Sequence, residues 1–478
     1  MGKITKNYIY NLLYQLFVLI VPLITTPYLA YTLGAEKVGS YGYVHSMAGI
    51  ICTFTMLGIF SYGNRQVAYV RDDREKLSEV FWQIMSVRGV IAVISTIIYF
   101  VVVCAIGRYI TLFFIYYTYM LAYYLDPTWL YVGVEDMKWA VIKNTLTKLI
   151  AVAGIFVFVK TDKDINIYVL IQGTSVLISN LLAYSQIKRY IGKPRFDLSN
   201  FMKDISGSAL LFLPGIATTI YTQCDKIMIE LMTGASSEVA FYDYSEKIVT
   251  IPLTFITVIS TVMMPRIAHE FKKGHKENIL ELLNKAAKFS LFIAFPMMVG
   301  LMVASTKLIP WYLGEGFTPT IVAIIIIAPI ILTNTLTGIS GGQYFTATNQ
   351  VKVLISSQFI AAAANVLINA ILIPHFGFYG AAVATTITSV ACALIQYSFL
   401  IKQVKLPGLL KKSLQYCAFS ITMGVVVYAV TKNMPAQPIT NIIQVVIGCL
   451  VYFSLAIVFK DQQVFLLINK GISVISKK

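Results

Sequence analysis

Long apolar runs recur along the whole chain and are separated by short polar stretches. The runs are about 20 residues long or longer, the length that a helix needs to cross a hydrocarbon core of ~30 Å. They lack the ~10-residue alternation that is typical of an outer-membrane barrel. The pattern therefore predicts an all-α polytopic membrane protein without an inserted soluble domain.

Fourteen membrane-spanning helices are predicted from these runs. They cover residues 8–33, 38–63, 79–106, 109–131, 139–159, 165–187, 205–232, 239–264, 286–306, 319–345, 351–373, 378–401, 412–430 and 440–459. The first run follows Lys3 and Lys6 and has no evident small-residue cleavage site. We therefore expect a first span there and not a cleaved signal peptide.

Composition and charge agree with this class of protein. The 478 residues are 57% hydrophobic and only 13% charged, too few polar residues to cover a soluble protein of this length. The net charge is +16, but most Lys and Arg residues lie on one side, the cytoplasmic side if Met1 is inside. This asymmetry indicates a membrane orientation with both termini cytoplasmic, and no nucleic-acid partner. The six cysteines lie in spans without a CxxC pair, which favours apolar core residues over disulfides or a metal site.

The chain resembles itself at a spacing near 200 residues. "LGAEKVGSYGYVHSM" (33–47) aligns with "TGASSEVAFYDYSEKI" (233–248) after one insertion, and the same offset places Arg65 on Arg266. This predicts two six-helix pseudo-symmetric lobes, 1–190 and 204–403, joined by a cytoplasmic linker, 191–203, and followed by two further helices and a tail in 404–478. Two parallel lobes that rock about a cavity are typical of an alternating-access transporter. Chance similarity between apolar sequences is the alternative.

Several charged residues lie inside predicted spans, where each costs ~2.5–3.5 kcal/mol on insertion scales. They indicate either a hydrated cationic cavity for an anionic headgroup or ion pairs between helices. For Lys226 with Glu230, and for Glu246 with Lys247, pairing is the favoured interpretation. For His45 the favoured interpretation is an interior histidine whose hydrogen bonds are satisfied within the protein. The candidate substrate-binding residues are Arg88, Lys148, Arg65, Arg266, Lys226, Lys247, Glu246 and His45.

Signatures of an enzyme are sparse. "HEFKKGH" (269–275) lacks the second histidine of a zinc-protease helix. The chain has no phosphate-binding GxxxxGK[ST] motif. The predicted outer loops are also too short for extramembrane chemistry. We therefore expect a transporter that does not use ATP directly.

The chain resembles the Wzx-type polysaccharide flippases of the MOP exporter superfamily along its whole length. The residues that carry the resemblance are "TTPYLAYTLGAEKVGSYGY" (25–43), "GIFSYGNRQVAYVRDD" (58–73), "CDKIMIELMTG" (224–234), "FYDYSEKI" (241–248), "LGEGF" (313–317) and "LIPHFGFYGAAVATTI" (372–387). In the last, Pro374, Gly377 and Gly380 predict a tight turn between two spans. No single motif is diagnostic without the spans and the repeat.

The resemblance implies export of an undecaprenyl-(di)phosphate-linked oligosaccharide from the inner to the outer leaflet of a bacterial inner or plasma membrane. It implies a cationic cavity, a lateral gap for the lipid tail, and an ion gradient or membrane potential as driving force. No cofactor is expected beyond Na⁺ or H⁺ as coupling ion. The expected partners are the lipid-linked glycan and the bilayer, with a monomer beside glycan polymerase machinery. A teichoic-acid-type flippase, a multidrug/cation antiporter and a polysaccharide polymerase are the alternatives.

The lipid II flippase branch of this superfamily implies a sodium site. Its matching positions here are Asp225, Asn365, Asn369 and Thr385. Sodium is a hard cation that prefers oxygen ligands. However, Asn369 stands where that branch has an acid, so one negative charge is missing. An interhelical hydrogen-bond network of the same residues is the alternative.

Overall fold

The computed structural model describes residues 3–56, 58–193 and 198–466. These residues form helices and loops and contain no β-strand, which confirms the all-α prediction. Two compact units are present, unit 1 (Met1–Ala240) and unit 2 (Phe241–Lys478), and each is described by itself. Their boundary falls inside one helix, whereas the predicted lobes meet at 191–203. The two six-helix lobes therefore stay a prediction.

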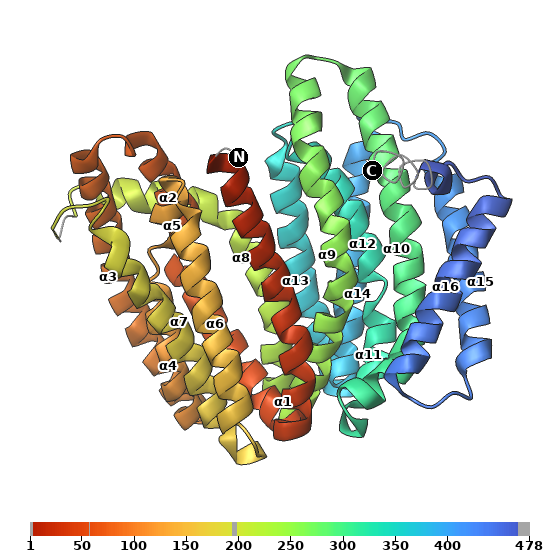
Figure 1. Ribbon diagram of the computed structural model, residues 1–478, viewed down its shortest axis with the longest axis horizontal. Coiled ribbons are helices and arrows are strands. Elements are labelled where there is room, and N and C mark those ends of the chain that lie inside the picture. Colours follow the sequence, from red (N-terminus) through yellow and green to blue (C-terminus); the bar gives the residue numbers. More distant parts are fainter. Residues whose placement is uncertain (1–2, 57, 194–197, 467–478) are drawn as a thin grey trace. The chain divides into compact units, whose positions relative to one another are not determined.

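Most α-helices of unit 1 are long, whereas two, Ile59–Val70 and Thr128–Gly133, are short (Figure 1). Helix α7 packs against both α4 and α6. The helices are α1 (Lys3–Met56), α2 (Ile59–Val70), α3 (Arg74–Ile106), α4 (Ile110–Tyr124), α5 (Thr128–Gly133), α6 (Met137–Phe158), the 3₁₀ turn η1 (Asp162–Asp164), α7 (Ile165–Ile187), α8 (Phe201–Thr233) and the first residues of α9 (Ser236–Lys272).

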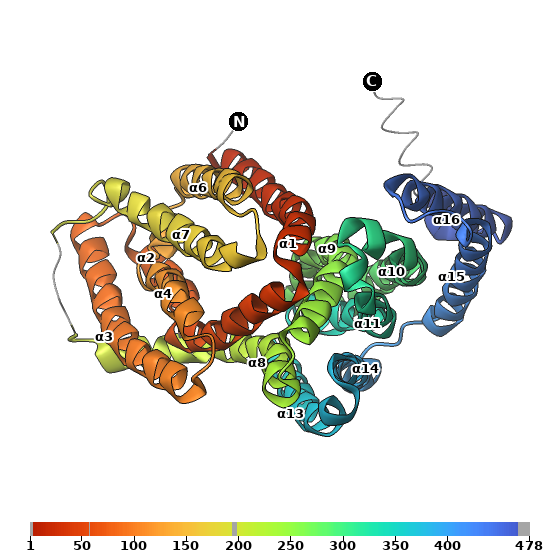
Figure 2. The same cartoon turned by 90° about the horizontal axis from the view of Figure 1, so that it is seen from below.

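Unit 2 holds the rest of α9 and the C-terminal helices. In it α13 and α14 form a hairpin, and α15 and α16 pack side by side and against α10 (Figure 2). The elements are α10 (Lys276–Tyr312), η2 (Glu315–Phe317), α11 (Pro319–Ile327), α12 (Ile330–Thr337), the π-helix η3 (Gly338–Phe345), α13 (Val351–Phe376), α14 (Phe378–Ile401), α15 (Leu409–Thr431) and α16 (Pro438–Val458).

Glycines and a cap set several helix ends. Gly34 has φ 72° and interrupts α1 between the predicted spans 8–33 and 38–63. Gly377, with φ 57°, makes the predicted tight turn between α13 and α14. At the start of α3, Asp73 Oδ1 accepts from the backbone N–H groups of Glu75 and Lys76, at 3.1 and 3.2 Å. The Lys76 N–H bond is the main reason that the pKa of Asp73 is lowered.

Eleven helices among the described residues are long and apolar enough to cross a membrane. This number takes Phe17–Val70 as one helix, although two predicted spans meet in it at Gly34. It also leaves out α4, which has 15 residues, and α8. The polytopic membrane architecture is confirmed. The eleven helices and the fourteen predicted spans differ in number because two spans are counted as one and because α4 and α8 are left out.

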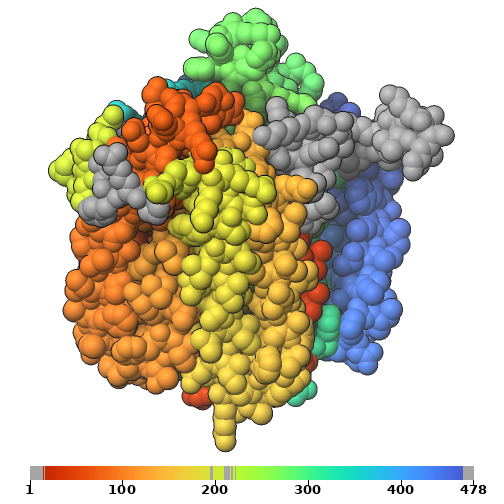
Figure 3. Space-filling view, turned by 60° about the vertical axis from the view of Figure 1, so that its left-hand side comes forward, coloured from red at the N-terminus to blue at the C-terminus, as the bar shows by residue number. Residues whose placement is uncertain are grey.

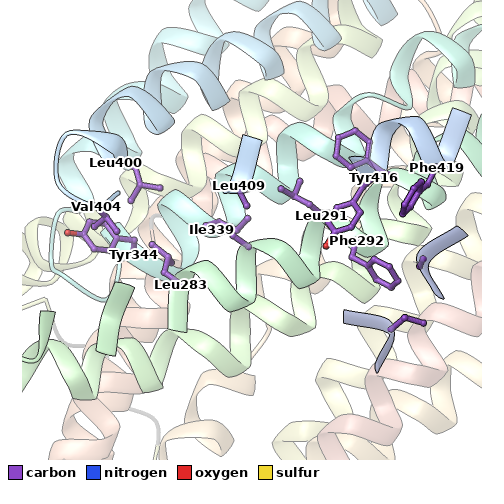
Figure 4. Packing of buried hydrophobic residues seen from close by; sticks show 14 of the residues in the cluster. Leu283, Leu291, Phe292, Ile339, Tyr344, Leu400, Val404, Leu409, Tyr416 and Phe419 are labelled. Atoms are coloured by element: carbon purple, nitrogen blue, oxygen red, sulfur yellow. The ribbon is translucent and has the colours of Figure 1, made fainter. Parts of the chain in front are cut away.

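The core of unit 2 is built where α10 meets η3, α14 and α15 (Figure 4). Leu283, Leu291 and Phe292 of α10 lie among the buried side chains there, with Ile339, Leu400 and Tyr416 from the other elements. Large apolar residues also remain exposed, for example Val445, Leu450 and Val458 of α16. Exposed apolar side chains are expected on helices that face lipid.

Candidate functional site

Arg88 of α3 is a buried charge, with 1% of its surface exposed. Its Nη1 donates to the carbonyl of Asp126 at 2.6 Å, and its Nη2 donates to the carbonyl of Tyr123. These carbonyls lie where α4 ends, and helix-end carbonyls need a partner from outside the helix. Arg88 therefore caps α4 in the structure. Its predicted contact with substrate stays a prediction.

The interruption between α4 and α5, next to Arg88, is stabilised by a second set of hydrogen bonds. Asp126 Oδ1 accepts from the backbone N–H of Thr128 at 2.9 Å and from its hydroxyl, so the carboxylate supports the start of α5. Pro127, between them, has no N–H to continue α4. Lys143 of α6, also buried, donates to Asn144 Oδ1 at 2.8 Å.

Lys148 is the candidate cation on α6. It is half-buried and makes no hydrogen bond or ion pair with the residues that the structure describes. The helical period places it on the side of α6 opposite most of the exposed apolar residues. Ile142, Leu146, Ile150 and Val157 lie about 120–180° around the helix from Lys148, whereas the exposed Leu149 and Phe158 lie about 100° and 80° from it. Figure 3 shows the face of unit 1 on which α6 and α7 run side by side. The Lys148 side chain therefore leaves α6 on its interior side.

His45 lies in an aromatic cluster of unit 1. Its Nδ1 is 2.8 Å from the hydroxyl of Tyr116, and its ring lies 5.7 Å from the ring of Tyr41. Tyr119 also contacts the imidazole with its ring edge. His45 thus has aromatic and hydrogen-bonding partners inside unit 1. Its role in binding substrate stays a prediction.

Glu230 of α8 is held by Ser236, six residues later, and by two residues that lie far away in the sequence. The hydroxyls of Tyr109 and Ser236 donate to its carboxylate at 2.8 and 2.9 Å, and Arg108 lies 3.7 Å away. Asp225 and Lys226, earlier on α8, are also buried. Tyr109 and Arg108 follow α3 and carry no sequence signal that links them to α8. The predicted pairing of Lys226 with Glu230 stays a prediction.

Lys247 of α9 pairs with the carboxylate one turn earlier. Its Nζ lies 2.6 Å from Asp243 Oδ2 and 5.1 Å from the centre of the Tyr244 ring. Half of the Lys247 side chain, 51%, remains exposed. Glu246, the other candidate on this helix, is half-buried. The ammonium of Lys247 is thus partly neutralised but accessible.

The two arginines predicted at the inner ends of spans are both exposed. Arg65 of α2 lies over the ring of Tyr62, with 5.8 Å to its centre, and the Tyr62 hydroxyl donates to Asp204 at 2.7 Å. Arg266 of α9 has no hydrogen bond or ion pair among the described residues. The guanidinium of Arg266 is therefore available to an anion such as a phosphate.

Three of the four candidate sodium ligands are linked in unit 2. Asn369 Nδ2 donates to Asn365 Oδ1 at 3.1 Å, and Asn365 Nδ2 donates to Thr385 Oγ1 at 3.2 Å. The hydroxyl of Tyr242 lies 3.0 Å from the same Oγ1. All are buried. The oxygens suit sodium by type, but those of Asn365 and Thr385 already accept hydrogen bonds. Asp225, the fourth candidate, belongs to unit 1.

An apolar cavity of about 450 Å³ lies among α9, α10, α15 and α16 of unit 2. The amide of Gln444 is a polar group at its wall, and its Nε2 donates to Thr431 Oγ1 at 3.0 Å. Such a cavity offers dispersion contacts but few hydrogen bonds, so it suits an apolar chain. Its wall includes Pro252, Pro296, Met297, Gly300, Met423, Val427 and Gly448.

Two family models match the chain, each over more than half of its length. The model described as "Polysaccharide biosynthesis protein" matches residues 4–271, and the one described as "Lipid II flippase MurJ" matches residues 145–446.

Relatives with similar sequences carry names of transporters and flippases. The "Putative O-antigen transporter" of Escherichia coli K12 is 23% identical over 355 residues, which are 73% of this chain and 85% of the relative. The "Probable low-salt glycan biosynthesis flippase Agl15" of Haloferax volcanii is 24% identical over 51% of each chain. The lipid II flippase MurJ of Thermosipho africanus is 28% identical over 45% of this chain and 44% of its own.

Solved structures share the fold at low sequence identity. The inward closed conformation of the lipid II flippase MurJ has a TM-score of 0.74 at 18% identity and covers 95% of this chain and 99% of its own. An inward-facing multidrug resistance MATE family transporter of the MOP superfamily has a TM-score of 0.61 at 11% identity, with coverage of 82% and 96%.

Proposed function

Because the chain belongs to the polysaccharide biosynthesis protein family, as a Wzx-type lipid-linked glycan flippase of the MOP exporter superfamily, we propose the route and the substrate in finer terms. The cargo is an undecaprenyl-(di)phosphate-linked oligosaccharide. It passes from the cytoplasmic to the outer leaflet of a bacterial cell membrane by alternating access. The protein is a transporter and performs no covalent chemistry on the glycan.

Cationic side chains of the spans receive the phosphate of this substrate. The cost of moving a diphosphate through hydrocarbon is mainly electrostatic, so fixed cations along the route lower it. Lys148, half-buried on the interior side of α6, supports this role best. Lys247 and Arg266 of unit 2 are exposed cations that support it as well.

The polyprenyl tail needs an apolar surface while the headgroup crosses. The 450 Å³ cavity among α9, α10, α15 and α16 has the required lining. We assign a short stretch of the tail to this cavity, because its volume is smaller than that of the whole polyprenyl chain, and the rest of the tail stays in the bilayer.

The driving force, orientation and assembly complete the proposal. An ion gradient or the membrane potential drives transport, with Asp225, Asn365, Asn369 and Thr385 as ligands of a coupling sodium ion. Both termini are cytoplasmic, in line with the distribution of Lys and Arg. The transporter works as a monomer beside glycan polymerase machinery.

The observation that carries the cationic route is the position of Lys148, a charge without a described partner on the interior side of a membrane helix. The test is transport of a fluorescent undecaprenyl-diphosphate-linked trisaccharide in proteoliposomes. Lys148→Ala should slow it by about tenfold or more, because a hydrogen bond to a charged group contributes about 1.5–3 kcal/mol. Lys163→Ala, in the exposed loop before α7, is the matched control and should keep the wild-type rate.

Two results would count against the proposal in different ways. A wild-type protein that does not move the labelled lipid would overturn the function. Wild-type transport with an unchanged rate for Lys148→Ala would overturn the cationic route through α6 alone.

A further inference from the structure

Helix α9 exposes two faces of different composition. One is apolar, with Phe255, Val258 and Val262 exposed by 65%, 57% and 50%. The other carries hydroxyls: Thr250, Thr257 and Thr261 are exposed and Thr254 is half-exposed. At 100° per residue the four threonines lie along one side of the helix, about 100° around from the apolar face. The apolar face suits contact with lipid, and the hydroxyl face can also meet polar groups.

The four threonines, here called the threonine row, present hydrogen-bond acceptors. Each hydroxyl donates to a backbone carbonyl three or four residues earlier, for example Thr250 to Lys247 at 2.8 Å and Thr257 to Thr254 at 2.9 Å. Thr254 and Thr261 do the same, at 3.2 and 2.8 Å. A hydroxyl has one donor and two acceptor sites, so each Oγ1 keeps acceptor capacity on the exposed side. The acceptors follow one another about one helical turn, ~5.4 Å, apart.

A buried amide lies beside the C-terminal end of the threonine row. Gln343 of η3 is fully buried, and its Nε2 donates to the hydroxyl of Ser260, next to Thr261 on α9, at 3.1 Å. Its Oε1 has no hydrogen-bond partner among the described residues. Because Gln343 is fully buried, a ligand can reach Oε1 only if the wall beside Ser260 opens, and the donor that it brings would then offset the cost of a buried amide oxygen without one. Gly338 allows the close approach of η3 to α9, because a Cβ there would lie 3.1 Å from Ser260 Oγ.

We propose that the threonine row, with Gln343 at its end, binds the sugar hydroxyls of the transported glycan. This inference rests on the proposed function and assigns the glycan to neutral hydroxyls, next to the phosphate-binding Lys247 one turn earlier on α9. Neutral acceptors complement the many O–H donors of a sugar and give no net attraction to a phosphate. From Thr250 to Thr261 the row extends about 16 Å along α9, room for several hydroxyls at once.

The test compares two lipids on the full chain in nanodiscs. Dissociation constants are measured for an undecaprenyl-diphosphate-linked trisaccharide and for undecaprenyl diphosphate without sugar. Thr254→Val and Thr257→Val keep the shape of the side chain and remove the hydroxyl. Each should weaken binding of the trisaccharide lipid about three- to tenfold, with sugar-free binding unchanged. Thr257→Ser restores the hydroxyl and should restore the affinity, and Val258→Thr, on the apolar face, should leave both affinities unchanged.

The outcomes separate the proposals. Unchanged affinities, or an equal loss for both lipids, would overturn the threonine row as a glycan site even if the wild type transports the lipid. Failure of the wild type to bind the trisaccharide lipid would overturn it too. Failure of the wild type to move that lipid in proteoliposomes would instead overturn the proposed function.

Discussion

At the scale of single residues, Arg88 and Lys148 show what a sequence can and cannot distinguish. Both are cations well inside predicted spans, and hydropathy treats them alike. In the structure Arg88 is enclosed by the carbonyls at the end of α4, whereas Lys148 has no described partner. The difference depends on a break in another helix that brings carbonyls to Arg88. Sequence reasoning could therefore find both charges but could not assign their tasks.

Arg88→Ala should destabilise the protein. The substitution leaves the carbonyls of Tyr123 and Asp126 without their donor in a buried place and should lower the free energy of unfolding by about 3 kcal/mol or more. The measurement is thermal unfolding of the purified protein in detergent, with Lys148→Ala as the control of unchanged stability. Arg88→Lys keeps the charge but loses the forked pair of N–H donors, so its stability should lie between those of Arg88→Ala and the wild type. Wild-type stability of Arg88→Ala with lost transport would make Arg88 a substrate ligand instead.

At the scale of elements, the hydrophobic pattern locates the helices well and their interruptions less well. Gly34 and the turn at Gly377 lie where the sequence predicts boundaries. The predicted span 109–131, in contrast, is divided into α4 and α5 at Asp126 and Pro127. The π-helix η3 lies unnoticed inside the predicted span 319–345. Hydropathy averages over a whole turn, so it does not register a local change in the hydrogen-bond ladder.

Gly63 of α2 should tolerate no side chain, because α5 packs directly against it. A Cβ at Gly63 would lie 2.6 Å from the Trp129 ring, which is itself stacked on Phe81. We expect Gly63→Ala to lower the free energy of unfolding by about 1–3 kcal/mol, because the added methyl group overpacks this contact. Gly89→Ala in α3 is the matched control, since a Cβ there meets nothing within 4 Å and the helix gains about 0.5–1 kcal/mol. Midpoints of thermal unfolding that shift in the same direction for both variants would contradict this view of the α2–α5 contact.

At the scale of the whole molecule, the class, the superfamily and the transported kind of substrate follow from the sequence. The hydrogen bonds among Asn365, Asn369 and Thr385 match the network that the resemblance left as an alternative, whereas the other polar contacts join residues that are far apart along the chain. Tyr109 and Glu230 are 121 positions apart, and Tyr242 and Thr385 are 143 apart. No local pattern of residue types predicts such pairs. These polar contacts therefore depend on the tertiary fold.

Coupling to sodium is a property of the whole molecule, because it links a cation to the binding of the lipid. If Asp225, Asn365, Asn369 and Thr385 hold a sodium ion that favours the substrate-bound form, sodium should tighten binding of the labelled lipid. A coupling free energy of about 1–3 kcal/mol corresponds to a gain of about fivefold or more relative to potassium. Asp225→Asn removes the carboxylate and should abolish the difference, whereas Asp162→Asn in the exposed loop should keep it. Equal affinities of the wild type in sodium and potassium would leave the four residues as a hydrogen-bond network, with the membrane potential or protons as the driving force.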